Sequence, residues 1–458
     1  MVLVASAYKI AGFHGVVWLC SIIIASLMLL FFKLLRAIGS SILVAFPLTL
    51  LATTVATYDW DVRPGIVTQL LFITTLFILQ KYKSTSDTRI LYSLPLIFLV
   101  WANTHLGFIV GFVAIGFTIL ERYLCFISEK DSVSRAKERR AIVVLVGLLG
   151  VSLLVTLINP NSYKLIPYFL RIADAQQNDY IMELKSPNFH SHILISFQLM
   201  LIVLIASLAF LPRKAELGTL LMTFVFLIAS LHSIRLSPFF AFLSCIVIAQ
   251  QVNPIFIPDP KKTQANPSIT EKLYARLRRF DELEEIFGSW ILPLLVSIVV
   301  TLTVMSGYTS RIVDLSFSKK NFPVEACNFA MQHGLPGNLY SSGYWGSYAI
   351  FSLYPKYKVF IDTRFDMYGD KIFFEVLECE YLTRYESVDV HAGDPNKIFD
   401  KYQVNWVLTG KESLLAIFLK KDMWWLEIHS DEVALIFLRN NHANSLWLKE
   451  NLRASSAK

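Results

Sequence analysis

The sequence predicts a polytopic α-helical membrane protein with a C-terminal extracytoplasmic α/β domain. The 458 residues are 55% hydrophobic and 17% charged, whereas soluble domains are roughly 45–50% apolar and about 25% charged. The long apolar runs lie in residues 1–307, and residues 308–458 read like a water-soluble sequence. Lysine and arginine residues are also concentrated in every second loop between the apolar runs. A single soluble globular domain does not fit these three observations.

About ten segments of residues 1–307 are expected to cross the membrane. A helix needs about 20 mostly apolar residues to cross roughly 30 Å of hydrocarbon. Pro95 interrupts the fourth segment, and the ninth is short. The segments lie near 15–32, 38–57, 65–80, 87–103, 107–127, 141–158, 192–211, 217–232, 236–250 and 290–307.

The basic residues predict the orientation. Of the 25 lysine and arginine residues before residue 308, one set of alternating loops carries 19 and the opposite set carries six. Basic residues mark cytoplasmic loops, so residues 308–458 are expected outside the cytoplasm. The net charge of +7 follows from this topology and gives no argument for a nucleic-acid partner. The lipid bilayer is the expected environment.

After the transmembrane region, 1–307, we expect a linker, 308–322, an α/β domain, 323–440, and a polar, frayed tail, 441–458. Pro323 and Gly334 bracket the first helix of this domain. The expected helices are 324–333, 346–353, 370–382 and 412–420. The expected strands are 338–340, 357–361, 403–408, 425–429 and 433–439.

Several chemistries have no motif in this sequence. It contains no glycine-rich phosphate loop, no His-Glu-x-x-His, no Cys-x-x-Cys and no Gly-x-Ser-x-Gly. Nucleotide hydrolysis, zinc proteolysis and serine-hydrolase chemistry are therefore not expected. Cys327 and Cys379 share the C-terminal domain and could pair, although separate buried thiols are the simpler interpretation.

The first candidate site is the loop 58–64. Asp59 and Asp61 are two carboxylates two residues apart, and Arg63 follows them. Carboxylates at this spacing can hold a hard divalent cation such as Mg²⁺ or Mn²⁺, and an arginine can bind phosphate bidentately. The alternative is a solvated loop with an acid–base pair.

Further candidates lie in the other loops expected on the outer side. Asn103 and His105 share a tight turn, where a neutral histidine could donate a hydrogen bond to a phosphate or a sugar hydroxyl. Helix capping is the alternative role of this turn. His232 and Arg235 lie in another turn, where Arg235 either meets an anion or snorkels. Glu183 belongs to the long loop 159–191, which could line the site of a lipid-linked substrate.

Several motifs together carry a resemblance to a known class of enzyme. They are Trp101-Ala102-Asn103-Thr104-His105-Leu106-Gly107-Phe108, Ile158-Asn159-Pro160-Asn161, Arg235, Gly343-Tyr344-Trp345-Gly346-Ser347-Tyr348 and Phe360-Ile361-Asp362-Thr363-Arg364-Phe365-Asp366-Met367-Tyr368-Gly369. With them the chain resembles a large, mostly uncharacterised group of bacterial multi-pass proteins that are similar to GT-C membrane glycosyltransferases. The resemblance implies a polyprenyl-phosphate-linked sugar as donor, an unknown acceptor, a site at the outer face of the bacterial plasma membrane and a soluble C-terminal domain.

The resemblance also implies a catalytic Asp or Glu in the first outer loop of the family. Residues 9–15 of this sequence are similar to the start of the family's second span. We therefore expect either that the natural start lies upstream, or that this chain is inactive or acts with a partner chain.

A remoter similarity is to the catalytic subunit of oligosaccharyltransferase. Asp59-Trp60-Asp61 would match its metal-binding Asp-x-Asp, and Tyr344 and Trp345 followed by Asp362 would match its acceptor-reading turn. A structural ion-pair turn is the alternative interpretation of Asp362, Arg364 and Asp366.

These residues lead to one main hypothesis, a glycosyltransferase-like membrane protein. Asp61, or an acid absent from this chain, would be the base, and Asp59 and Asp61 would hold the cation. Arg63, His232 and Arg235 would bind the donor phosphate. The alternatives are a non-catalytic assembly or scaffold protein of the same fold and a transporter or flippase.

Overall fold

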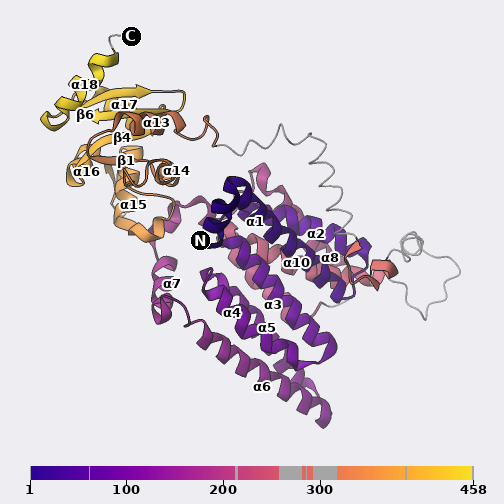
Figure 1. Ribbon diagram of the computed structural model, residues 1–458. Coiled ribbons are helices and arrows are strands. Elements are labelled where there is room, and N and C mark those ends of the chain that lie inside the picture. The colour runs from indigo at the N-terminus through magenta and orange to yellow at the C-terminus, as the bar shows by residue number, and fades with distance from the viewer. Residues whose placement is uncertain are drawn as a thin grey trace. The chain divides into compact units, whose positions relative to one another are not determined.

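The computed structural model of the chain describes residues 2–60, 62–211, 215–256, 281–284, 286–291, 317–386 and 389–455. They form two compact units (Figure 1). The first unit comprises Met1–Leu170 and Ile181–Ile312, and the second comprises Arg171–Tyr180 and Val313–Lys458.

The described part of the first unit is built from helices and the turns and loops between them (Figure 1). Short 3₁₀ turns, among them Thr57–Asp59, Leu106–Phe108, Met182–Leu184 and Ile234–Leu236, join its helices. The helices are α1 (Val2–Ala37), α2 (Ile42–Ala56), α3 (Gly65–Thr85), α4 (Leu94–Ala102), α5 (Ile109–Ser128), α6 (Ser132–Val155), α7 (Leu165–Ala173, which runs into the second unit), α8 (Ile195–Phe210), α9 (Leu217–His232) and α10 (Ser237–Phe256).

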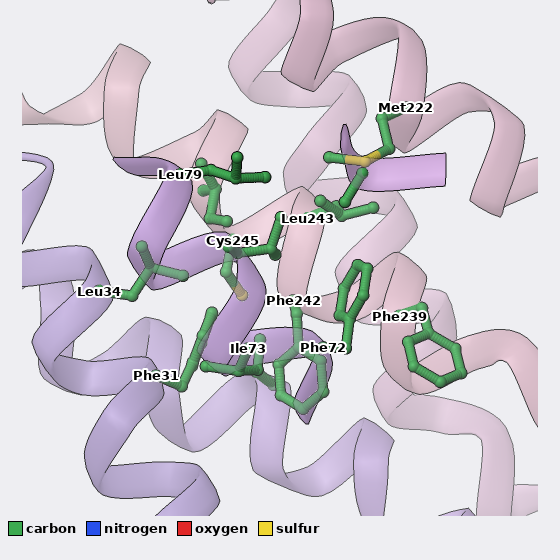
Figure 2. Packing of buried hydrophobic residues seen from close by; sticks show 14 of the residues in the cluster. Phe31, Leu34, Phe72, Ile73, Leu79, Met222, Phe239, Phe242, Leu243 and Cys245 are labelled. Atoms are coloured by element: carbon green, nitrogen blue, oxygen red, sulfur yellow. The ribbon is translucent and has the colours of Figure 1, made fainter. Parts of the chain in front are cut away.

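Helix α10 is the central element of this unit. It packs against α2, α8, α9 and α1, and almost every side chain from Phe239 to Ala249 is buried. Figure 2 shows the aromatic packing around it: the Phe31 and Phe242 ring centroids are 4.9 Å apart, and those of Phe72 and Phe239 are 5.1 Å apart. A helix that is apolar all round needs such a surrounded position.

The outer helices expose apolar side chains. Ile202 and Ile205 are each 63% exposed and Ile228 is 70% exposed, a pattern that suits contact with lipid and is costly in water. Among the described residues, six helices are long and apolar enough to cross a membrane: Val2–Ala37, Ile42–Asp59, Gly65–Thr85, Leu106–Ser128, His192–Phe210 and Ile234–Asn253. The described part of the chain is thus consistent with a helical membrane protein.

The number of ten crossings stays a prediction. Thr88–Ala102 and Leu217–His232 are apolar but shorter helices, and α6 begins with three polar turns before its apolar part. The tenth expected span, 290–307, lies almost wholly outside the described residues. The first helix begins at Val2 and not near residue 15, with a break at Ala11 and Gly12.

The second unit is a small α/β domain. Its main sheet has the order β1-β4-β6-β5, with β1 parallel to β4 and the other neighbours antiparallel. The strands are β1 (Asn338–Ser341), β4 (Val404–Gly410), β5 (Trp425–Ser430) and β6 (Ala434–Arg439), and a separate hairpin joins β2 (Thr383–Glu386) and β3 (Asp389–Ala392). The helices are α13 (Val324–His333), α14 (Gly343–Leu353), α15 (Phe365–Tyr381), α16 (Pro395–Lys401), α17 (Leu414–Lys421) and α18 (Ser445–Ser455).

Helices cover both faces of the main sheet. Trp406 and Ile436 belong to one apolar cluster with residues of α13 and α14, and Val407 and Phe437 belong to the other with residues of α15, α16 and α17. Successive strand residues point to opposite faces, so the two clusters are the two sides of one sheet. Each fully buried side chain of this size contributes roughly 1.5–3 kcal/mol.

The second unit differs from the sequence expectation in four places. The segment 357–361 is not a strand, although Tyr357 and Ile361 are buried. Helix α16, the β2–β3 hairpin and the helix α18 in the expected polar tail were not predicted. Cys327 and Cys379 belong to clusters on opposite faces of the sheet, and both are free thiols.

Part of the long loop 159–191 belongs to the second unit. The carboxylate of Asp370 accepts hydrogen bonds from the backbone N–H groups of Gln176 and Gln177. The Tyr180 ring packs on Phe373 and Phe374. Residues 171–180 are thus an integral part of a unit whose other residues follow more than 130 positions later.

Candidate functional site

Glu183 lies between two arginines that come from distant parts of the chain. Its carboxylate accepts two hydrogen bonds of 2.8 Å from Nη1 of Arg63, and Nη1 of Arg235 lies 3.5 Å from its Oε1. The side chains of Arg63, Glu183 and Arg235 are 46%, 29% and 33% exposed. Ion pairs this exposed add about 0–1 kcal/mol to stability, so stability does not account for the arrangement.

Backbone contacts fix the position of Glu183. The N–H of Ile234 donates to the carbonyl of Lys185 at 3.0 Å, and the Ser233 hydroxyl donates to the carbonyl of Glu183 at 3.4 Å. Ser233 has an extended backbone that ends α9 and starts the 3₁₀ turn carrying Arg235. The turn before α10 therefore determines the positions of both Arg235 and the loop that carries Glu183.

His105 lies close enough to Arg235 for the arginine charge to act on it. Desolvation by burial, and secondly the charge of Arg235, lower the pKa of His105 to about 4. Its Nδ1 accepts a hydrogen bond from the N–H of Gly107 at 3.1 Å, which leaves the proton of the neutral ring on Nε2. At neutral pH His105 is therefore an uncharged donor beside a permanent cation.

A buried hydrogen-bond chain holds the His105 ring. The indole N–H of Trp101 donates to Thr68 Oγ1 at 3.0 Å, and Thr68 Oγ1 lies 2.8 Å from His105 Nδ1. Because Nδ1 of His105 carries no proton, the Thr68 hydroxyl is the donor to it, while the Thr68 oxygen accepts from the indole. Gly107 permits this contact, because a Cβ there would lie 2.5 Å from Cγ2 of Thr68.

Asp59 is held at the start of α3 by a second polar chain. The Gln69 amide donates to Asp59 Oδ2 at 3.0 Å, and the Trp60 indole donates to Gln69 Oε1 at 3.1 Å. Asp61 lies outside the described residues. Across the described ranges, no three His, Cys, Asp or Glu side chains come together as a metal site.

The two other expected residues of these turns do not join this group. Asn103 donates to the carbonyls of Leu99 and Ile158, both at 2.8 Å, so it caps α4 and ties it to the end of α6. His232 is the exposed last residue of α9.

The expected site residues of the second unit have structural contacts. Asp362 is buried and accepts hydrogen bonds from the backbone and guanidinium of Arg364 and from the Tyr368 hydroxyl. Burial raises the pKa of Asp362, but these hydrogen bonds and the Arg364 charge outweigh it and hold the pKa below its usual value. Asp366 lies in the first turn of α15.

Trp345 is buried, whereas its neighbour Tyr344 is exposed. Trp345 is buried in the sheet cluster and its indole donates to the carbonyl of Asn321 at 3.0 Å. Tyr344 is 89% exposed. At Gly346 a Cβ would lie 1.9 Å from the carbonyl oxygen of Ile361, so the Trp-Gly pair is explained by close packing in this turn.

Sequence reasoning missed Thr68 and Gln69. Both are buried polar residues in the first turns of an apolar helix. Polar residues at membrane depth are costly, and that signal could have identified them. Comparison with models of protein families and with curated protein sequences found no match, so the resemblance to GT-C enzymes stays a prediction from motifs.

Proposed function

We propose that this chain is a glycosyltransferase-like protein of the bacterial plasma membrane that uses a polyprenyl-phosphate-linked sugar at its outer face. The observation that carries the proposal is the cluster of Arg63, Glu183 and Arg235, with His105 beside it. Two partly exposed guanidinium groups share one carboxylate, which is the arrangement an exchangeable anion site needs. A phosphate offers more acceptor oxygens than Glu183 and binds arginine bidentately.

In this proposal the cluster holds the donor phosphate. An acceptor hydroxyl attacks the anomeric carbon, the bond from that carbon to the phosphate oxygen breaks, and polyprenyl phosphate leaves. Asp61, or an acid absent from this chain, takes the proton of the hydroxyl. Asp59 and Asp61 would also hold a divalent cation, Mg²⁺ or Mn²⁺, which would neutralise the leaving phosphate; of these two residues, the structure describes Asp59.

The test is binding of farnesyl phosphate to the full chain in lipid nanodiscs, measured by microscale thermophoresis with farnesol as the uncharged reference. Arg63→Ala and Arg235→Ala should each weaken binding about 10-fold or more, since hydrogen bonds to charged groups are worth roughly 1.5–3 kcal/mol. Lys164→Ala removes an exposed cation from the same loop as Glu183 and should leave the affinity unchanged. Equal affinity for farnesyl phosphate and farnesol would contradict the proposal.

A further inference from the structure

A second feature of the helical unit is a pocket lined by hydroxyl groups. It has a volume of about 120 Å³ and lies between the end of α2 and the starts of α8 and α10. Its lining includes Thr54, Thr57, Tyr58, Ser196 and Ser237. The remaining lining residues, Val55, Ile193, Leu194 and Phe197, are apolar, so no lining residue is charged.

The Ser237 hydroxyl needs a partner that the chain does not supply. Ser237 is 1% exposed, and its Oγ has no hydrogen bond with any described residue. A buried hydroxyl left unpaired costs about 1–3 kcal/mol, and native proteins leave few of them. Because Ser237 lines the pocket, an occupant of the pocket is in position to pair with it.

The other hydroxyls have capacity for the same occupant. Thr54 and Thr57 donate to the carbonyls of Leu51 and Thr54, so their oxygens can still accept hydrogen bonds. Tyr58 and Ser196 add two further hydroxyls to the lining. The pocket thus offers both donors and acceptors, as an occupant with several hydroxyl groups requires.

The pocket is lined by residues close in the chain to the cluster of Arg63, Glu183 and Arg235. Ser237 follows Arg235 by two residues, and Tyr58 precedes Arg63 by five. The charge of Glu183 acts on the Tyr58 hydroxyl. A molecule with its phosphate on the arginines could therefore place a neighbouring group in the pocket.

We infer that the pocket holds an uncharged, hydroxyl-bearing ring, the sugar that is attached to the phosphate in the cluster. The volume corresponds to roughly ten water molecules, which is the room that one monosaccharide ring fills. Phe197 and Leu194 provide an apolar wall for the C–H face of the ring. A prenyl or acyl chain would leave the buried Ser237 hydroxyl unpaired at a free-energy cost. The inference depends on the proposed function for the position of the phosphate.

The experiment compares two kinds of probe on the full chain in lipid nanodiscs. One probe is farnesyl phosphate, and the others are farnesyl phosphates that carry glucose, galactose, mannose or N-acetylglucosamine. Binding is measured by microscale thermophoresis for the wild type, Ser237→Ala and the double variant Thr54→Val with Ser196→Ala. Thr53→Val is the matched control, because Thr53 is half-buried on the same helix and does not line the pocket.

We expect at least one sugar-bearing probe to bind the wild type more tightly than farnesyl phosphate does. Both pocket variants should weaken that binding at least fivefold and change the affinity for farnesyl phosphate less than twofold. Thermal unfolding in detergent verifies that each variant is folded, and a variant that unfolds is replaced by Ser196→Ala alone.

Two results would overturn the inference while leaving the proposed function intact. One is that no sugar-bearing probe binds better than farnesyl phosphate; the other is that the pocket variants weaken both kinds of probe equally, as a structural role or a prenyl site would. Failure of the proposed function is seen separately, as an Arg235→Ala variant that binds farnesyl phosphate like the wild type.

Discussion

The carboxylate of Glu183 occupies the space in which an external anion would meet Arg63 and Arg235. It competes with any phosphate for the same guanidinium groups, because it already accepts hydrogen bonds from one of them and lies 3.5 Å from the other. The Glu183 side chain thereby lowers the affinity of the two arginines for an external anion.

Glu183→Gln should therefore tighten the binding of farnesyl phosphate, by about two- to fivefold. The amide keeps the shape of the side chain and removes the competing charge, and exposed pairs of this kind are worth up to about 1 kcal/mol. Glu129→Gln makes the same change in an exposed loop that contacts neither arginine and should have no effect. Weaker binding by Glu183→Gln would mean that Glu183 positions the arginines and does not compete with the ligand.

At the scale of elements, the starts of α3 and α5 meet through side chains that sequence periodicity does not reveal. Gly107 lies in the turn before α5 and allows Thr68 of α3 to reach His105. The contact joins residues 37 positions apart, and only the folded chain brings them together.

Gly107→Ala should destabilise the helical unit by about 1–3 kcal/mol, the usual cost of overpacking, and should weaken the binding of farnesyl phosphate by moving His105. Gly116→Ala is the matched control on α5, because a Cβ there meets nothing within 4 Å. It should be neutral or stabilising by up to about 1 kcal/mol. The measurement is thermal unfolding in detergent together with the binding assay, and equal behaviour of the two variants would contradict the role of Gly107.

Sequence patterns predicted the positions of helices and strands better than they predicted which strands pair. The helix 324–333 was predicted from Pro323 and Gly334 and is confirmed, and Gly334 ends it in the αL conformation. The segment 357–361 was predicted to be a buried strand and is not one, whereas β1 pairs with β4 across more than 60 residues. That choice of partner depends on long-range packing and not on the local sequence.

The candidate site was predictable to a similar degree. The sequence identified the charged residues Arg63, Glu183 and Arg235, because each lies in a loop that was expected on the outer side. It did not reveal that Glu183 is shared by both arginines, or that Thr68 and Gln69 hold His105 and Asp59. The first relation arises where the turn before α10 meets the loop that carries Glu183, and the others arise from side chains of α3.

At the scale of the whole molecule, the second unit contains a group that titrates near neutral pH. Burial raises the pKa of Glu380 to about 7, although the hydrogen bond from Tyr340 lowers it. The ordinary value of 4.5 applies to the unfolded chain. Because the folded pKa is the higher one, the stabilisation is complete below about pH 4.5 and is lost as the pH rises through about 7.

The opening free energy of the second unit should fall by about 2 kcal/mol between pH 5.5 and 8. Hydrogen exchange of the β1 amides (Asn338–Ser341) in the full chain, corrected for intrinsic rates, measures this change. Glu380→Gln keeps the acceptor for Tyr340 and should abolish the pH dependence, whereas Glu412→Gln, an exposed control, should retain it. A pH-dependent opening in Glu380→Gln equal to that of the wild type would assign the effect to another group.

The passage of residues 171–180 through the second unit also determines when that unit can finish folding. The ribosome makes this segment more than 130 residues before the sheet to which it belongs. It must stay available while the intervening helices are synthesised, since Asp370 and the Phe373–Phe374 pair have their contacts with it. A fragment that begins at residue 313 would lack this segment, and supplying residues 171–180 as a separate peptide should restore the missing contacts.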